Sequence, residues 1–136
     1  MSVEFVDTNV LLYAQDSASG RKYTKSVELL TRLAEQVGGA LSIQVLVEFY
    51  TAATRKLAMT SLEAEETIAD LGRWTIHRPS HSDVLKACKL HRKYKVQWWD
   101  AMILNSAIET GCSVLWTEDL NDGQRYGTVT ARNPFR

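Results

Sequence analysis

The segment FVDTNVLLYA, residues 5–14, contains a carboxylate between two apolar runs. The first run ends at Asp7 like a short buried strand, and the second resumes at Val10 after the polar residues Thr8 and Asn9. A carboxylate at such a point commonly caps a helix by accepting hydrogen bonds from unpaired backbone N–H groups. The residues that the fold brings beside Asp7 therefore decide whether it also has a chemical role.

On the C-terminal side of this segment, short apolar runs alternate with segments of helical periodicity. Together with the opening run, the expected strands cover residues 3–6, 40–43, 74–77, 113–116 and 127–131. The expected helices cover residues 21–37, 44–57, 60–73, 82–94 and 100–110. Such alternation is typical of βαβ units with right-handed crossovers. The sequence predicts an α/β fold, a single domain of residues 1–136 with a central, mainly parallel sheet of four or five strands.

The spacing of apolar residues predicts which side of each helix faces the core. For the helix at 21–37, the expected inward residues are Val27, Leu30, Leu33, Ala34 and Val37. For the helix at 44–57, they are Val45, Phe49, Ala53 and Leu57. For the helix at 82–94, they are Val84, Leu85, Cys88 and His91. Thr60 and Glu63 have the spacing of a capping box at the start of the helix at 60–73.

Three further acids fall at comparable places in these elements. Glu48 lies in the opening turns of one helix, Asp100 begins another, and Asp119 follows the strand at 113–116. Residues just after the strands of an open parallel sheet converge on one crevice. Each acid alone has an ordinary explanation as a surface, cap or turn residue. Together with Asp7, they predict a cluster of carboxylates.

A cluster of this kind needs a cation. Two carboxylates about 4 Å apart repel by about 4 kcal/mol at an effective dielectric constant of 20. Oxygen ligands with open water positions suit Mg²⁺ or Mn²⁺ rather than Zn²⁺, and such ions serve phosphate chemistry. The acids therefore favour a metal-dependent reaction at phosphate.

Composition excludes several other classes. The 136 residues carry 16 basic and 16 acidic side chains, so the net charge does not indicate nucleic acid or membrane as a partner. Cys88 and Cys112 lack C-x-x-C spacing, so we expect free thiols in a reducing compartment. The sequence has neither an apolar run long enough for a membrane span nor the pattern of a signal peptide. We expect a cytoplasmic protein.

The ordered motifs FVDTN, SIQVLVEF, WWDA and LWTEDL resemble those of the PIN-domain nucleases, in particular the VapC-type toxins of bacterial toxin–antitoxin pairs. The likeness covers essentially the whole chain, down to NPF at residues 133–135. It implies a PIN-like three-layer α/β/α fold and Mg²⁺- or Mn²⁺-dependent endonucleolytic cleavage of RNA. It also implies a homodimer and a cognate antitoxin that occupies the active-site groove.

The resemblance also assigns residues. It implies that the catalytic, metal-binding acids are Asp7, Glu48, Asp100 and Asp119, with hydrogen-bonding support from Thr8, Asn9 and Thr117. Glu118 is a second acid beside Asp119, and only one of two neighbours can face the metal. The T-x-D pattern of the family favours Asp119.

Other polar and aromatic residues have less definite roles. Trp98 and Trp99 suit either the core or the stacking of a base. The histidines share no ligand spacing and are expected to be structural. Lys86, Lys89 and Lys93 share one helical face, and they are either solvated or contact RNA phosphates beside the metal site.

The sequence also allows alternative functions. A phosphatase or phosphoryl-accepting domain also places an aspartate after its first strand, although an aspartate-nucleophile phosphatase would need a second acid where Asn9 stands. A binding module whose acids only cap helices would gain no stability from metal. A PIN nuclease of RNA processing would act without an antitoxin.

Overall fold

The structure is a computed structural model that describes residues 3–36 and 38–136. The strands, in chain order, are β1 (Glu4–Val6), β2 (Gly39–Ser42), β3 (Thr75–His77), β4 (Val114–Trp116), β5 (Arg125–Tyr126) and β6 (Val129–Arg132). The α-helices are α1 (Thr8–Tyr13), α2 (Arg21–Gln36), α3 (Ile43–Lys56), α4 (Ser61–Asp70), α5 (His81–Tyr94) and α6 (Trp98–Glu109). Short 3₁₀ turns, η1 (Ser17–Ser19) and η2 (Leu71–Arg73), follow α1 and α4.

The strands described here form one sheet in the order β3-β2-β1-β4-β6-β5. All neighbours pair in parallel except β5 and β6, which are antiparallel. The expected strand at 127–131 is wrong in its bounds, because Gly127, with φ of +62°, lies between two short strands. The sheet therefore has six strands among the described residues, where four or five were expected.

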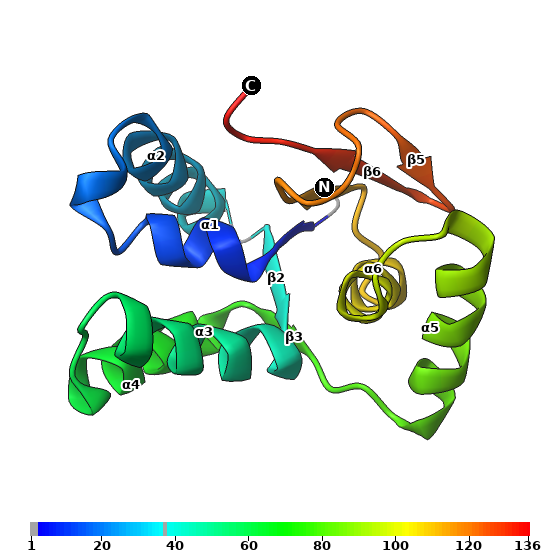
Figure 1. The fold of residues 1–136 in the computed structure, drawn as a ribbon, viewed down its shortest axis with the longest axis horizontal. Coiled ribbons are helices and arrows are strands. Elements are labelled where there is room, and N and C mark those ends of the chain that lie inside the picture. The colour runs from blue at the N-terminus through cyan, green and yellow to red at the C-terminus, as the bar shows by residue number, and fades with distance from the viewer. Residues whose placement is uncertain (1–2, 37) are drawn as a thin grey trace.

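The order of the strands fixes the helical layers. The chain moves from β1 to β2 to β3 in one direction and then returns past β1 to β4. With right-handed crossovers, α1 to α4 cover one face of the sheet, and α5 and α6 cover the other. Figure 1 shows these two groups on opposite sides of the strands. The three-layer α/β/α expectation is confirmed, and the direction of winding reverses between β1 and β4.

Two helices face the core differently from the sequence-based prediction. On α2, the buried residues are Ser26, Leu29 and Leu33, so the predicted stripe is displaced by about one position. Val27 and Leu30 are partly buried and Ala34 is exposed, while Val37 lies outside the described residues. A small polar residue, Ser26, takes an inward position for which apolar spacing gives no signal.

Helix α5 shows the same displacement. Its buried residues are Asp83 and Ala87, whereas Val84 and Leu85 are exposed, so these two predicted core positions are wrong. Cys88 is partly buried, and His91 is exposed. Asp83 faces inward because its carboxylate accepts hydrogen bonds from the Ser80 backbone at 2.7 Å and the Asn105 amide at 3.0 Å.

Several other predictions agree with the structure. The capping box of Thr60 and Glu63 is present at the start of α4. On α3, Val45, Phe49 and Ala53 are buried as predicted.

Helix α6 begins at Trp98, two residues before the predicted start, so Asp100 lies in its first turn and is not its cap. No helix within the described ranges has the length and apolar composition to cross a membrane.

Candidate active site

Asp7 directly follows β1 and caps α1. Its Oδ1 accepts a hydrogen bond from the Thr8 backbone N–H at 2.6 Å, and its Oδ2 accepts one from the Thr117 hydroxyl at 2.7 Å. The side chain is buried, with the residue 4% exposed. Both carboxylate oxygens therefore have a donor, and the residue is at once a helix cap and a buried charge.

Asp119 lies beside Asp7 because β4 pairs in parallel with β1. Thr117, also buried, donates its hydroxyl to Asp7 and accepts a hydrogen bond from the Asp119 backbone N–H at 3.0 Å. The Asn9 side-chain amide donates to Asp119 Oδ2 at 3.0 Å. Thr117 and Asn9 thus hold the two carboxylates in a fixed relation across the point where the winding of the sheet reverses.

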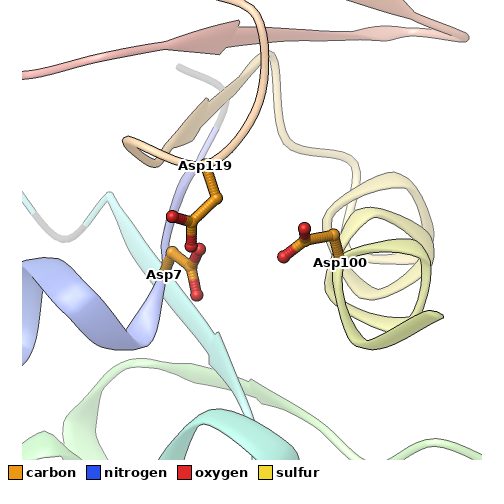
Figure 2. A group of neighbouring side chains, drawn as sticks. All are labelled: Asp7, Asp100 and Asp119. Carbon is orange, nitrogen blue, oxygen red and sulfur yellow. The ribbon is translucent and has the colours of Figure 1, made fainter. Parts of the chain in front are cut away.

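Asp100 approaches from the opposite helical layer. Figure 2 shows its side chain projecting from α6 towards Asp7 and Asp119. One carboxylate oxygen from each of the three aspartates lies within 4.8 Å of the others. Asp100 is in the first turn of α6, where the positive end of the helix dipole favours a carboxylate. In the described part of the chain, its carboxylate accepts no hydrogen bond.

Glu48 lies next to this trio but is not one of its members. Its Oε1 accepts hydrogen bonds from the Thr8 hydroxyl at 3.4 Å and the Gln44 amide at 3.2 Å. It borders the same groove as the three aspartates. The structure therefore brings all four predicted acids to one region, with Glu48 at the side of a tighter cluster.

Glu118 points elsewhere. Its carboxylate accepts a hydrogen bond from the Tyr13 hydroxyl at 2.6 Å and an ion-pair hydrogen bond from Lys22 at 2.9 Å. Of the two adjacent acids after β4, Asp119 is the one in the cluster.

Burial and mutual repulsion shift the acids towards the protonated form. Burial raises the pKa of Asp7 to about 7, and Asp119 and Asp100 add to the effect, against hydrogen bonds from Thr117 and Thr8. Burial, then Asp119 and Glu48, raise the pKa of Asp100 to about 6. The pKa values of Glu48 and Asp119 are also raised, first by burial. Protons or a cation must offset this concentration of negative charge.

The cluster lies where two grooves meet. One groove, of about 480 Å³, is bordered by all four acids together with Trp99, Arg55 and Lys56. The other, of about 420 Å³, shares Asp100 and Asp119 and includes Lys95. A long flexible ligand lying in both grooves would therefore pass over the acids.

The two tryptophans have different surroundings. Trp98 is partly buried and packs edge-on against His91, with 6.2 Å between ring centroids. Trp99 is 61% exposed at the border of the larger groove. Its backbone carbonyl accepts a hydrogen bond from Gln44 at 3.3 Å, which links the start of α6 to α3.

Sequence reasoning missed two cations of the larger groove, Arg55 and Lys56 in the last turn of α3. Arg55 follows Glu48 by seven residues, which is two helical turns. This spacing places both residues on one face of the helix and was a signal in the sequence for Arg55. By contrast, Lys86, Lys89 and Lys93 border neither groove. Lys86 pairs with Glu109 at the far end of α6 from Asp100.

The donor set suits a hard divalent cation. Three carboxylates converge, one of them buried, and the described groups of this cluster include no sulfur or imidazole ligand. Mg²⁺ and Mn²⁺ prefer such oxygen ligands and retain water in their other positions. The residues present therefore fit the metal that the sequence predicted.

The comparisons with known proteins agree with the fold. A family model described as PIN domain matches residues 5–125. A toxin–antitoxin complex from Klebsiella pneumoniae is similar, with 23% identity, a TM-score of 0.70, and coverage of 96% of this chain and 97% of that chain. VapBC2 from Rickettsia felis, bound to a DNA fragment from its promoter, has 19% identity, a TM-score of 0.68, and coverage of 96% and 98%.

A third solved structure is VapC20 of Mycobacterium tuberculosis, which is described as a toxin that cleaves the sarcin-ricin loop. It has 17% identity and a TM-score of 0.67, with coverage of 93% of this chain and 98% of that chain. No curated protein sequence matches the chain.

Proposed function

Because the chain belongs to the PIN domain family, whose model matches residues 5–125, we propose that it is a metal-dependent endoribonuclease and the toxin of a toxin–antitoxin pair. The observation that carries the nuclease proposal is the convergence of Asp7, Asp100 and Asp119 within 4.8 Å at the junction of two open grooves. The similarity to solved toxin structures supports the toxin role.

In this proposal, Asp7, Asp100 and Asp119 would hold Mg²⁺ or Mn²⁺, which would activate water and neutralise charge developing on the phosphate. Thr117 and Asn9 orient two of the carboxylates through the hydrogen bonds described above. We assign Glu48 the role of accepting a proton from water, because it borders the same groove as the three aspartates and its Oε1 is held by Gln44. Thr8 supports the same oxygen.

We place single-stranded RNA in the larger groove. Trp99 offers an exposed indole face for stacking of a base, and Arg55 and Lys56 offer charge to phosphates. We retain Lys86, Lys89 and Lys93 as proposed contacts for RNA that flanks the cleavage site. The C-terminal end of α5 is the end nearest to the groove that includes Lys95.

The direct test is cleavage of a labelled single-stranded RNA by the purified protein. We expect cleavage with Mg²⁺ or Mn²⁺, none with EDTA, and at least a hundredfold loss in Asp100→Asn, since electrostatic groups at reacting centres contribute on this order. Asp70→Asn, an identical change at an exposed acid at the end of α4, is the matched control and should cleave normally. Full activity in chelator would contradict the proposal.

The toxin role has its own test. Expression of the wild-type chain should arrest bacterial growth, and Asp100→Asn should not, because growth arrest depends on RNA cleavage. We propose that the cognate antitoxin occupies the grooves. Its addition should therefore abolish cleavage. Active nuclease that leaves growth unchanged would instead indicate a PIN nuclease of RNA processing.

We further propose a homodimer. Four apolar side chains are exposed on adjoining parts of α3 and α4, namely Ile43, Val47, Tyr50 and Leu62. A row of this kind is more typical of an interface than of a free surface. Sedimentation should give a dimer for the wild type and a monomer for Leu62→Glu, and a wild-type monomer would refute this part of the proposal.

A further inference from the structure

The loop after β4 carries two neighbouring acids that are held in opposite directions. Asp119 turns towards Asp7 and Asp100, as Figure 2 shows, whereas Glu118 turns towards α1 and α2. The Glu118 side chain is 22% exposed, and both of its oxygens are occupied: Oε1 by the Tyr13 hydroxyl at 2.6 Å and Oε2 by the Lys22 ammonium at 2.9 Å.

The two groups that hold Glu118 are themselves fixed. The Lys22 ammonium is 3.3 Å from the Tyr13 hydroxyl, 4.9 Å from the centre of the Tyr13 ring and 5.6 Å from that of Phe135. Tyr13 and Phe135 pack edge to face, with centroids 5.2 Å apart. We call Tyr13, Lys22 and Phe135 the Glu118 clamp. It joins α1, α2 and the C-terminal segment to the loop that carries Asp119.

An isolated ion pair on a surface contributes little, so charge alone does not explain this arrangement. Three features separate the clamp from such a pair: both oxygens are used, two aromatic rings lie beside the ammonium, and the anchored residue is the neighbour of Asp119. The Asp119 side chain has one protein donor among the described residues, Asn9. Its direction therefore depends strongly on how the loop is held.

Proximity adds an electrostatic reason. Glu118 directly precedes Asp119 in the chain, so the two carboxylates stay close together unless their side chains are held apart. A Glu118 side chain free to swing back would bring another negative charge to the cluster and compete with Asp119 for the same space. The clamp keeps that carboxylate on the outer side of the loop.

We propose that Lys22 and Tyr13 are positioning residues which, by anchoring Glu118, direct Asp119 towards Asp7 and Asp100 and increase the affinity of the site for a divalent cation. This inference rests on the proposed metal site. Lys22 and Tyr13 touch neither the cation nor RNA in this account. Their effect passes through the backbone of residues 117–119.

Removal of the Lys22 charge distinguishes positioning from simple electrostatics, because the two predict opposite changes in the affinity for a cation. Removal of the Lys22 charge makes the surroundings of the site more negative, which by field alone would tighten binding of a cation. Loss of positioning would weaken it. Groups that orient metal ligands commonly change affinity by 10- to 100-fold, and for a contact acting through the loop we expect the lower end, roughly tenfold.

The experiment is a titration of the metal-free protein with Mn²⁺, followed by electron paramagnetic resonance of free Mn²⁺ well below the melting temperature of every variant. Lys22→Met should bind roughly tenfold more weakly. Tyr13→Phe, which removes one hydrogen bond without a change of charge, should also weaken binding, by a smaller factor. Lys22→Arg, which retains the cation, should restore most of the affinity.

Lys25→Met is the matched control. It removes the same charge from the same helix, where Lys25 pairs only loosely with Glu28 at 3.9 Å. Its affinity for Mn²⁺ should equal that of the wild type or slightly exceed it.

Two results would overturn the inference, and they can be told apart. If the wild type binds Mn²⁺ and Lys22→Met or Tyr13→Phe binds it equally well or more tightly, the clamp has no positioning role while the metal site stands. If the wild type itself binds no Mn²⁺, the proposed metal site fails and the inference fails with it. A loss of thermal stability without a loss of Mn²⁺ affinity belongs to the first case.

Discussion

At Asp7, a single side chain caps a helix and belongs to a charged cluster. Its hydrogen bonds with Thr8 and Thr117 use both oxygens, so replacement by asparagine would remove a charge but also disturb a cap. Asp100 has no such structural contact among the described residues. The two aspartates therefore differ in what their substitution can reveal, and Asp100 reports more cleanly on repulsion within the cluster.

The first prediction follows from that difference. Without metal, Asp100→Asn should unfold at a higher temperature than the wild type, because one of the mutually repelling charges is gone. A gain of about 1 kcal/mol corresponds to a few degrees for a domain of this size. The gain should vanish or reverse in Mg²⁺, which stabilises only the wild type effectively. Calorimetry in EDTA and in Mg²⁺ measures both, and a lower melting temperature of the variant in EDTA would show that repulsion is unimportant.

The second prediction concerns pH. The pKa of Asp7 is raised to about 7 and that of Asp100 to about 6, above the value of about 3.9 for an aspartate in an unfolded chain. Between about pH 4 and pH 7, the metal-free folded protein thus binds more protons than the unfolded chain. Its free energy of unfolding should fall as pH rises through this window and then level off, by an amount on the order of a few kcal/mol.

Urea unfolding in EDTA at about pH 5 and about pH 8 measures this fall. Asp83, whose pKa is lowered to about 2 mainly by the Ser80 backbone, remains charged at both pH values. It therefore does not contribute to the fall in stability. Asp100→Asn should reduce the fall, and Mg²⁺ should largely remove it. Equal or greater stability at the higher pH without metal would contradict the raised pKa values.

At the scale of elements, α3 now carries more of the proposed RNA contact than α5. Arg55 and Lys56 border the groove that contains the acids, whereas Lys86 pairs with Glu109 away from Asp100. In an Asp100→Asn background, Arg55→Gln with Lys56→Gln should flatten the dependence of log K on log salt by about 0.7 per lost phosphate contact for single-stranded RNA.

Lys86→Gln with Lys89→Gln is the comparison for that experiment. It removes the same number of charges from α5 and should change the slope less, since neither residue borders a groove. A larger change in this second variant would assign the principal RNA contact to α5, which is one of the two roles that the sequence left open for these lysines.

Some features of the helices and strands can be predicted from the sequence, and others cannot. The end of β1 and the start of the capped helix α4 follow from an apolar run and a capping box that act locally. The inward faces of α2 and α5 do not, because Ser26 and Asp83 are buried polar residues. Asp83 is satisfied by an amide on α6, a partner distant in sequence that periodicity cannot supply.

At the scale of the whole molecule, the site results from topology. The winding of the sheet reverses between β1 and β4, and ligands of open parallel sheets bind at such a point. The convergence of Asp7 and Asp119 was therefore predictable from strand endings. The separate direction of Glu118 depends on contacts with Tyr13 and Lys22, which are distant in sequence, and local sequence patterns do not determine it.

The proposed nuclease requires that Asp7, Asp100 and Asp119 form one binding site for a divalent cation. Anomalous diffraction from crystals soaked in Mn²⁺ tests it directly, since the position of the ion is seen without reference to activity. We expect a peak in contact with carboxylate oxygens of all three residues, and no such peak in Asp100→Asn under the same conditions. Mn²⁺ bound elsewhere, or a peak of equal height in the variant, would contradict it.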